Sequence, residues 1–233
     1  MDKDLNVSIV IPCYEMKEYG VKFLDELIKS IAIQDYTDYE VVVSDHSQNT
    51  LIETYCNNCI IPIKYFRCET RHGSSSHNLN NAIEHSIGKY IKPMFQDDMF
   101  SKKTSLGEYV KNIEGEDWVV GNCYHINYDF KQWHSPHHAQ QITDEKPFAL
   151  GVNTFGAPSR IMFKKNHLRF DDNLIWLMDC EFYTRYFREF GNPKIINEYL
   201  VLCRLWDGTV SNDLSNSDVK RQEFEYVKEK LYE

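Results

Sequence analysis

Residues 89–98 read KYIKPMFQDD, an apolar run that ends in two adjacent acidic side chains. The run over Tyr90–Phe95 predicts a buried strand, and Asp97 and Asp98 follow its carboxyl end. Two like charges are too costly to bury without compensation, so this pair must face water, a cation or a hydroxyl-rich ligand. Ligands of open α/β sheets bind outside the carboxyl ends of the strands. The pair therefore indicates a metal or sugar site, with an acidic turn as the simpler alternative.

The segment before this pair alternates between strand and helix patterns. Strand patterns cover Val7–Tyr14, Tyr39–Ser44 and Ile63–Arg67, and helical patterns cover Tyr19–Ile33, Thr50–Asn58 and Leu79–Ser86. This alternation predicts a mostly parallel, doubly wound α/β sheet with helices on both faces. Because the carboxyl ends of parallel strands meet at one edge, the polar residues that follow them should converge on one crevice. These residues are Tyr14, Glu15, Asp45, Ser47, Arg71, Asp97 and Asp98.

Length and composition limit the class of protein. With 233 residues and 42% hydrophobic residues, the chain can bury the core of one α/β domain. No run approaches the roughly 20 apolar residues of a transmembrane segment. The seven cysteines, an odd number, are typical of reduced thiols in a cytoplasmic protein. The net charge of -9 disfavours nucleic acid as a partner.

Four segments carry a resemblance to a known family: Ser8–Tyr14, Val42–Ser47, Gly88–Ile91 and Gln96–Asp98. Their order and spacing resemble the family 2 glycosyltransferases of the GT-A fold, and the likeness continues beyond Pro158. It implies transfer of a sugar from a nucleotide diphosphate donor to an acceptor hydroxyl on a glycan or related molecule, with inversion at the anomeric carbon. It also implies one domain over residues 1–233, with a nucleotide-binding half to about residue 98, an acceptor and catalytic half over about 99–211 and a helical tail over 212–233.

The resemblance and the chemistry of the side chains together suggest how a nucleotide is held. Tyr14 can stack on the base, and Asp45 can accept from the imide of uracil or thymine, which favours a UDP- or dTDP-sugar. Alternatively, Tyr14 closes the strand, and Asp45 caps the next helix. Arg71 is expected to meet phosphate or base, or to be a surface arginine. The expected nucleotide-binding residues are Pro12, Tyr14, Glu15, Asp45, Ser47, Arg71 and Asp97.

By the family pattern, Asp97 faces the ribose and Asp98 binds the metal. Mn²⁺ or Mg²⁺ suits an oxygen-only site that bridges two phosphates. The family often has an acidic residue where this chain has Gln96, and we expect the metal site to survive that difference because both aspartates remain.

The carboxyl half is expected to supply the catalytic base and the rest of the pocket. Residues 176–182 lead into a helix, and by the family pattern an acidic pair here contains the base. Met178 replaces the first acid and Asp179 keeps the second, which suffices to take the acceptor proton. An aspartate that only stabilises the helix start is the alternative. Glu181 is a candidate acceptor contact.

Two further segments resemble parts of the same site. Residues 155–163 resemble the segment that lines the donor-sugar pocket, and residues 204–211 resemble a flap over the diphosphate that often carries a histidine. Near that histidine position the chain has Trp206 or Asp207. Together with Met178 and Glu181, the pocket residues expected here are Gln96, Gly156, Pro158, Ser159, Arg204, Trp206 and Ser211.

The remaining features concern histidines and the chain end. His134, His137 and His138 are expected in a polar loop after a strand that ends near Tyr128, where a solvated or sugar-binding surface is favoured over zinc. Residues 217–233 predict a weakly amphipathic helix that packs on the domain or pairs with a second copy in a homodimer. The mixed charge of this helix disfavours contact with a membrane surface.

Two other functions remain open from the sequence. A nucleotidyltransferase would show a glycine- and arginine-rich phosphate loop near the first strand, which residues 12–15 are not. A nucleotide-sugar-binding or glycan-binding module that has lost catalysis gains support from Met178. Release of nucleotide from the donor without acceptor separates these alternatives.

Overall fold

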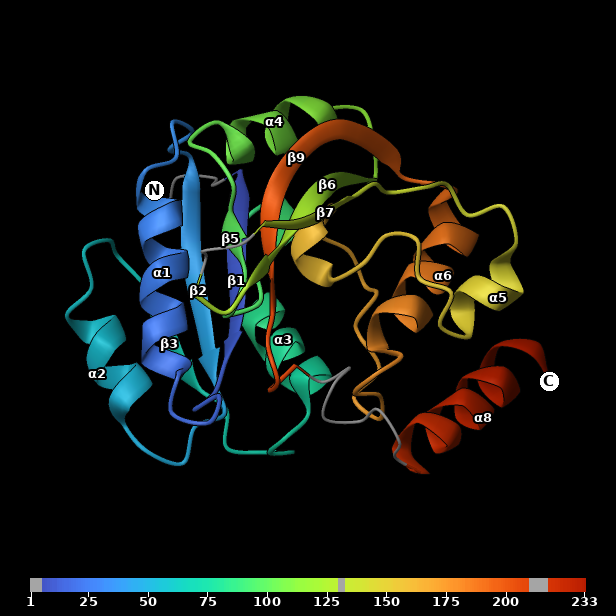
Figure 1. Ribbon diagram of the computed structural model, residues 1–233, viewed down its shortest axis with the longest axis horizontal. Helices are drawn as coiled ribbons and strands as arrows, with labels where there is room; N and C mark the ends of the chain where they lie inside the picture. The colour runs from blue at the N-terminus through green and yellow to red at the C-terminus, as the bar shows by residue number, and fades with distance from the viewer. Residues whose placement is uncertain (1–5, 130–132, 210–217) are drawn as a thin grey trace.

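The computed structural model describes residues 6–129, 133–209 and 218–233. Within these ranges, a nine-stranded sheet runs in the order β3-β2-β1-β4-β8-β6-β9-β5, and β7 pairs with β6. Helices flank this sheet on both faces (Figure 1). The α/β architecture predicted from the sequence is confirmed.

The amino-terminal strands are parallel and joined by helices. The strands are β1 (Val7–Cys13), β2 (Tyr39–Asp45), β3 (Lys64–Arg67) and β4 (Tyr90–Pro93), and the helices are α1 (Gly20–Ala32), α2 (Leu51–Asn57) and α3 (Ser75–Glu84). Cys13 lies opposite Asp45, and Asp45 lies opposite Arg67, so the strands end at one edge of the sheet. In β1, Ile9 and Ile11 pack in one core cluster and Val10 packs in the other, because alternate side chains point to opposite faces.

Two boundaries in this half differ from the sequence prediction. Helix α3 begins at Ser75 rather than Leu79, since the Ser74 hydroxyl accepts from the His77 backbone N–H at 3.2 Å and caps the helix. Strand β4 ends at Pro93 rather than Phe95. The chain then turns, and the Asp98 N–H donates to Phe95 O at 2.9 Å. The acidic pair therefore lies in a turn.

The carboxyl half forms a mixed part of the sheet. Its strands are β5 (Met99–Phe100), β6 (Trp118–Asn127), β7 (Trp133–His137), β8 (Ile161–Lys164) and β9 (Lys194–Leu205). Strand β8 is antiparallel to both β4 and β6, whereas β6 and β9 are parallel. The helices are α4 (Ser105–Ile113), α5 (Glu145–Ala149), the 3-10 turn η1 (Pro158–Arg160), α6 (Met178–Phe190) and α8 (Asp218–Tyr232).

The prediction of a polar loop around His134 to His138 was wrong in part. Residues 133–137 form β7 and pair antiparallel with β6, with Cys123 opposite His137. This short polar segment contains Pro136 and lacks the alternating apolar pattern of a strand. Its pairing with β6 therefore could not be predicted from its own sequence.

Two large core clusters lie on the two faces of the sheet. One contains Leu24, Leu27 and Ile28 of α1, and the other contains Phe182 of α6 and Val227 of α8. Helix α8 therefore packs on the domain, as one of the two alternatives predicted. All seven cysteines are free thiols. None of the helices in the described ranges has both the length and the apolar character that crossing a membrane requires.

Candidate functional site

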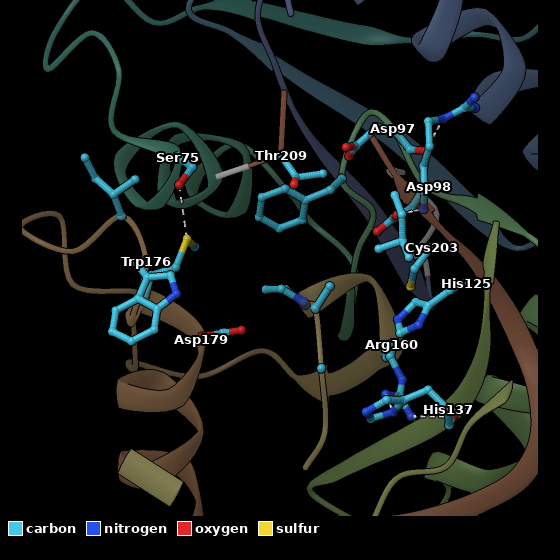
Figure 2. Close-up of a pocket in the computed structure, with 18 residues that line it drawn as sticks. Ser75, Asp97, Asp98, His125, His137, Arg160, Trp176, Asp179, Cys203 and Thr209 are labelled. Carbon is cyan, nitrogen blue, oxygen red and sulfur yellow. Dashed lines mark hydrogen bonds between the residues drawn. The ribbon is translucent and has the colours of Figure 1, made fainter. Parts of the chain in front are cut away.

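Two adjoining cavities open at the carboxyl edge of the parallel strands. The larger, here called the Asp98 pocket, has a volume of about 320 Å³ and is lined in part by Asp97, Asp98, Gly156, Pro158, Met178, Asp179 and Arg204 (Figure 2). The smaller, here called the Tyr14 pocket, has a volume of about 270 Å³ and is lined in part by Pro12, Tyr14, Glu15, His46 and His72. Ser75, Phe95 and Ile175 line both, so the two cavities form one continuous cleft.

The Tyr14 pocket is built from the turn after β1. Tyr14 is 41% exposed, so a planar ligand in this pocket can reach its ring. Its backbone N–H donates to Gln96 Oε1 at 3.0 Å, and Gln96 Nε2 donates to Gly20 O at 2.7 Å. Gln96 is buried. It therefore holds the turn that presents Tyr14 and does not line the cleft.

Asp45 lies beneath the cleft and is fully buried. Its Oδ1 accepts from the Ser47 backbone N–H at 2.8 Å, and its Oδ2 accepts from the Tyr65 hydroxyl at 2.8 Å. Arg67 NH1 is 3.7 Å from Oδ2. In this structure, Asp45 and Ser47 organise the turn after β2, and the neighbouring His46 lines the Tyr14 pocket instead.

Arg71 lies outside both cavities. Its guanidinium is 3.7 Å from Asp172 Oδ2, in a separate polar cleft that Asn80 and Lys230 also line. Its backbone φ is +52°, an uncommon value for a residue with a side chain. Arg71 is thus placed as an exposed cation and not beside Asp98.

The acidic pair lies in the turn between β4 and β5, at one side of the Asp98 pocket (Figure 2). Asp97 Oδ2 accepts from Trp206 Nε1 at 3.0 Å, and Asp98 Oδ1 accepts from the Arg204 backbone N–H at 3.1 Å. Burial raises the pKa of the Asp97 carboxyl above its ordinary value. Burial, and secondly the charge of Asp97, raise the pKa of Asp98 to about 8. A cation beside the pair would favour the ionised form of both carboxyls.

Arg204 supports the acidic turn from β9. Its Nε donates to Asp97 O at 3.0 Å, and its NH2 donates to Glu26 Oε2 of α1 at 2.6 Å. The guanidinium also lies 4.2 Å from the centre of the Phe23 ring. The charged end of Arg204 is therefore directed towards α1, although the residue lines the pocket. Ser211 lies outside the described residues.

Ser159 also acts behind the turn. Its hydroxyl accepts from the Phe95 backbone N–H at 2.8 Å, and its carbonyl accepts from the buried Lys92 ammonium. Burial lowers the pKa of Lys92 to about 7. Of the expected 155–163 segment, Gly156 and Pro158 line the pocket and Ser159 supports it.

Asp179 lies in the first turn of α6, across the pocket from the acidic pair in Figure 2. Its Oδ2 accepts from Asn153 Nδ2 at 2.7 Å, and its Oδ1 accepts from the Cys180 backbone N–H at 2.7 Å. Burial raises the pKa of Asp179 to about 6. The carboxylate is thus ionised at neutral pH and basic enough to take a proton there.

Glu181 does not face the cleft. It is fully buried, and its Oε1 is 2.6 Å from Arg185 Nε and 2.8 Å from Lys230 Nζ. The prediction that Glu181 contacts an acceptor does not fit this position. The neighbouring Met178 does line the pocket, and the Ser75 hydroxyl is 3.1 Å from its sulfur.

One wall of the pocket carries His125 of β6, His137 of β7, Arg160 of η1 and Cys203 of β9 (Figure 2). The sequence prediction missed His125 and Cys203, and it included His137 only in a polar loop and Arg160 only within the 155–163 segment. Arg160 NH1 is 2.5 Å from His137 Nδ1. Because arginine only donates, Nδ1 must be the unprotonated nitrogen, and the neutral ring then carries its proton on Nε2. Nε2 has no hydrogen-bond partner in the part of the chain that the structure describes. His137 therefore holds one free N–H donor in the pocket wall.

The acidic pair fits a divalent cation. No group of three or more histidine, cysteine, aspartate or glutamate side chains with metal-binding geometry occurs among the described residues, so the chain itself would supply one or two carboxylates. Mg²⁺ and similar ions are bound in this way when a diphosphate and water complete the coordination. The half-buried Asp97 and the buried Asp98 are the residues that would hold such an ion.

Comparison with solved structures places the fold. The S. aureus TarS fragment 1-349 in complex with UDP-GlcNAc aligns with a TM-score of 0.70 and 17% identity, covering 96% of this chain and 64% of that one. The mannosyltransferase PcManGT from Pyrobaculum calidifontis, in complex with GDP-Man and Mn²⁺, aligns with a TM-score of 0.61 and 16% identity, covering 88% and 57%. These likenesses show a shared GT-A-like fold.

Sequence comparison gives the family. An uncharacterized glycosyltransferase of Rickettsia felis is 30% identical over 187 residues, which are 75% of this chain and 30% of that protein. The GalNAc(5)-diNAcBac-PP-undecaprenol beta-1,3-glucosyltransferase of Campylobacter jejuni is 27% identical over 120 residues, 50% of this chain and 38% of that protein. The chain thus spans about a third of the length of these relatives. The sequence profile of Glycosyl transferase family 2 matches residues 8–187, and the protein belongs to this family.

Proposed function

We propose that the protein is a metal-dependent, inverting glycosyltransferase that uses a nucleotide diphosphate sugar. The observation that carries the proposal is the placement of Asp98 and Asp179 on one pocket, with Asp179 across from the acidic turn (Figure 2). The Tyr14 pocket adjoins it and presents an exposed aromatic ring. This arrangement supports a donor placed with its base, its diphosphate and its sugar in order along one cleft.

The chemistry follows from these positions. The acceptor oxygen attacks the anomeric carbon of the donor while its proton passes to the Asp179 carboxylate. The bond between the anomeric carbon and the diphosphate oxygen breaks, and the nucleotide diphosphate leaves with the electron pair. A divalent ion held by Asp98, when bound, supplies positive charge to the leaving diphosphate. Attack from the face opposite the leaving group inverts the anomeric carbon.

We further propose that the base is uracil or thymine and the transferred sugar is a hexose or deoxyhexose. The TarS complex with UDP-GlcNAc supports uracil as the base, although the PcManGT complex contains GDP-Man. The C. jejuni glucosyltransferase supports a hexose as the transferred sugar. The base would stack on Tyr14, with His46 and His72 beside it. The acceptor is proposed to be a hydroxyl of a glycan or related molecule. The His137 N–H is a candidate donor to an oxygen of the transferred sugar, because His137 lines the Asp98 pocket.

The test is release of nucleoside diphosphate from a panel of UDP-, dTDP- and GDP-sugars in the presence of Mn²⁺. We expect a pyrimidine donor to be consumed fastest, and we expect Asp98→Ala to remove the activity. Glu69→Ala, at an exposed residue away from both cavities, is the matched control and should behave as the parent. Faster consumption of GDP-sugars would contradict the proposed base, and equal activity in Asp98→Ala would contradict the proposed metal site.

A further inference from the structure

Helix α8 carries one buried carboxylate whose partners lie next to the proposed catalytic base. Glu223 is only 5% exposed, on a helix whose acidic residues otherwise face solvent. Its Oε1 accepts from the Ile175 backbone N–H at 2.7 Å. Its Oε2 accepts from the N–H groups of Trp176 and Leu177 at 2.9 and 2.8 Å. Three successive backbone donors thus converge on one side chain.

These three donors precede α6 directly. The first backbone N–H groups of a helix have no partner within the helix and need one from outside. Leu177, the residue at the N-cap of α6, makes no side-chain capping bond. Glu223, which lies 46 to 48 residues further along the chain, therefore satisfies the N–H of this N-cap residue and the N–H groups of the two residues before it with charge-assisted hydrogen bonds. A carboxylate at this end of α6 also interacts favourably with the helix dipole.

The bound segment forms part of the cleft. Ile175 lines both cavities, Trp176 lines the Asp98 pocket, and Asp179 follows Leu177 by two residues. Helix α8 holds the same segment at a second point, because Lys230 Nζ is 2.5 Å from Asp171 Oδ2 and 2.8 Å from Glu181 Oε1. The segment from 171 to 181 is thus tied to α8 on both sides of Glu223's contacts. Helix α8 lies outside residues 8–187, which the family profile matches.

We propose that Glu223 is a positioning residue: by binding the backbone of residues 175–177, it holds Asp179 in the pocket and makes α8 part of the active site. The proposal rests on the proposed function for the role of Asp179 as base. The ordering of residues 175–177 by Glu223 does not depend on the proposed function.

The test compares Glu223→Gln with the parent protein. Glutamine has the same shape but brings an NH₂ group to at least one of the three N–H donors. Backbone hydrogen exchange at residues 175–177 should become at least about tenfold faster, since a hydrogen bond to a charged group is lost. Exchange in β1 should stay unchanged. Glu229→Gln, on the exposed side of α8, is the matched control.

The functional readouts separate positioning from general stability. In Glu223→Gln, turnover should fall about tenfold while the Kd for UDP with Mn²⁺ stays within about twofold. The Asp179 carboxyl, followed by ¹³C NMR titration, should titrate at lower pH because water reaches it more easily. Glu223→Asp keeps the charge, but its side chain is one methylene shorter. Its turnover and exchange rates should therefore lie between those of the parent and those of Glu223→Gln. If the glutamine variant fails to fold, Glu223→Asp carries the same measurements.

Three results would overturn the proposal: unchanged exchange at residues 175–177, unchanged titration of Asp179, or a loss of UDP affinity equal to the loss of turnover. Failure of the proposed function looks different. In that case the parent itself releases no nucleoside diphosphate from any donor, while the exchange and titration measurements still report whether Glu223 positions Asp179.

Discussion

Asn153 Nδ2 lies 2.7 Å from Asp179 Oδ2 and donates a hydrogen bond to it. The other end of the Asn153 amide fixes its orientation, because Oδ1 accepts from the N–H groups of Phe155 and Gly156 at 2.9 and 2.8 Å. Asn153 thus links the turn that lines the pocket to the carboxylate proposed as base. A hydrogen bond to the ionised form of a carboxyl lowers its pKa, so Asn153 opposes the effect of burial on Asp179.

Replacing Asn153 with alanine should therefore raise the pKa of Asp179 and misplace it. We expect turnover to fall about tenfold and the acidic limb of the pH profile of kcat to move to higher pH, since a hydrogen bond to a charged group is worth about 1.5–3 kcal/mol. UDP affinity should not change. Asn58→Ala, at the exposed end of α2, is the control. A profile that stays in place would show that Asn153 does not tune the base.

The parent enzyme should show a single acidic limb in kcat with a midpoint near pH 6. Asp179 must be ionised to accept the proton, and burial raises its pKa to about 6, so activity is lost as pH falls through that value. The raised pKa of Asp179 has the opposite effect on folding stability. The protonated form is favoured in the folded state, so the contribution of Asp179 to stability is present at low pH and is lost as pH rises through about 6. A pH profile of kcat at saturating donor checks this, and activity that stays flat to well below pH 6 would contradict it.

Binding of UDP should depend on a divalent ion and on Asp98. The two phosphates need positive charge, and the guanidinium of Arg204, which lines the pocket, is turned towards α1. Calorimetry should show that Asp98→Ala weakens UDP binding in Mn²⁺ by at least about tenfold. Asp97→Ala should weaken it less and keep the response to metal. If the parent and Asp98→Ala bound UDP with equal affinity, and if this affinity were the same in Mn²⁺ and in excess chelator, the metal site would be ruled out.

The contact between Trp206 and Asp97 should set donor affinity. A Cβ atom at Gly208 would overlap with the Trp206 indole ring, so Gly208→Ala should displace the ring and break its 3.0 Å hydrogen bond to Asp97. We expect UDP affinity to fall about tenfold, and Trp206→Phe to have a similar effect. Gly107→Ala, in α4, is the control, because a Cβ there meets only ordinary contacts. Unchanged UDP affinity in both Gly208→Ala and Trp206→Phe would show that Trp206 does not contribute to donor binding.

Much of the fold follows from local patterns. Strands β1 and β2 are buried on both faces, and each has a continuous apolar centre, Ile9–Ile11 and Val41–Val43. The α1 pattern places Leu24, Leu27, Ile28 and Ile31 on its buried side. The acidic pair is predicted from its place after a strand pattern, and Asp179 from the resemblance to the family. All three residues line the Asp98 pocket.

The contacts that the sequence did not predict are made between distant segments. Asp45 was expected to face a base, but its partner Tyr65 lies on the neighbouring strand β3, and strand pairing cannot be derived from the Asp45 segment alone. Strand β7 exists because β6 pairs with it. Asn153 and Glu223 contact the α6 start from 26 and 46 to 48 residues away. No periodic pattern encodes such contacts.

The most direct test of the whole account is the separation of donor binding from turnover in Asp179→Asn. The UDP affinity, measured by calorimetry in Mn²⁺, should match the parent within about twofold, because Asp179 lies across the pocket from the acidic pair. Turnover of the preferred donor should fall by about 10²–10⁴ because the variant cannot take the acceptor proton. Full turnover in Asp179→Asn would contradict the account.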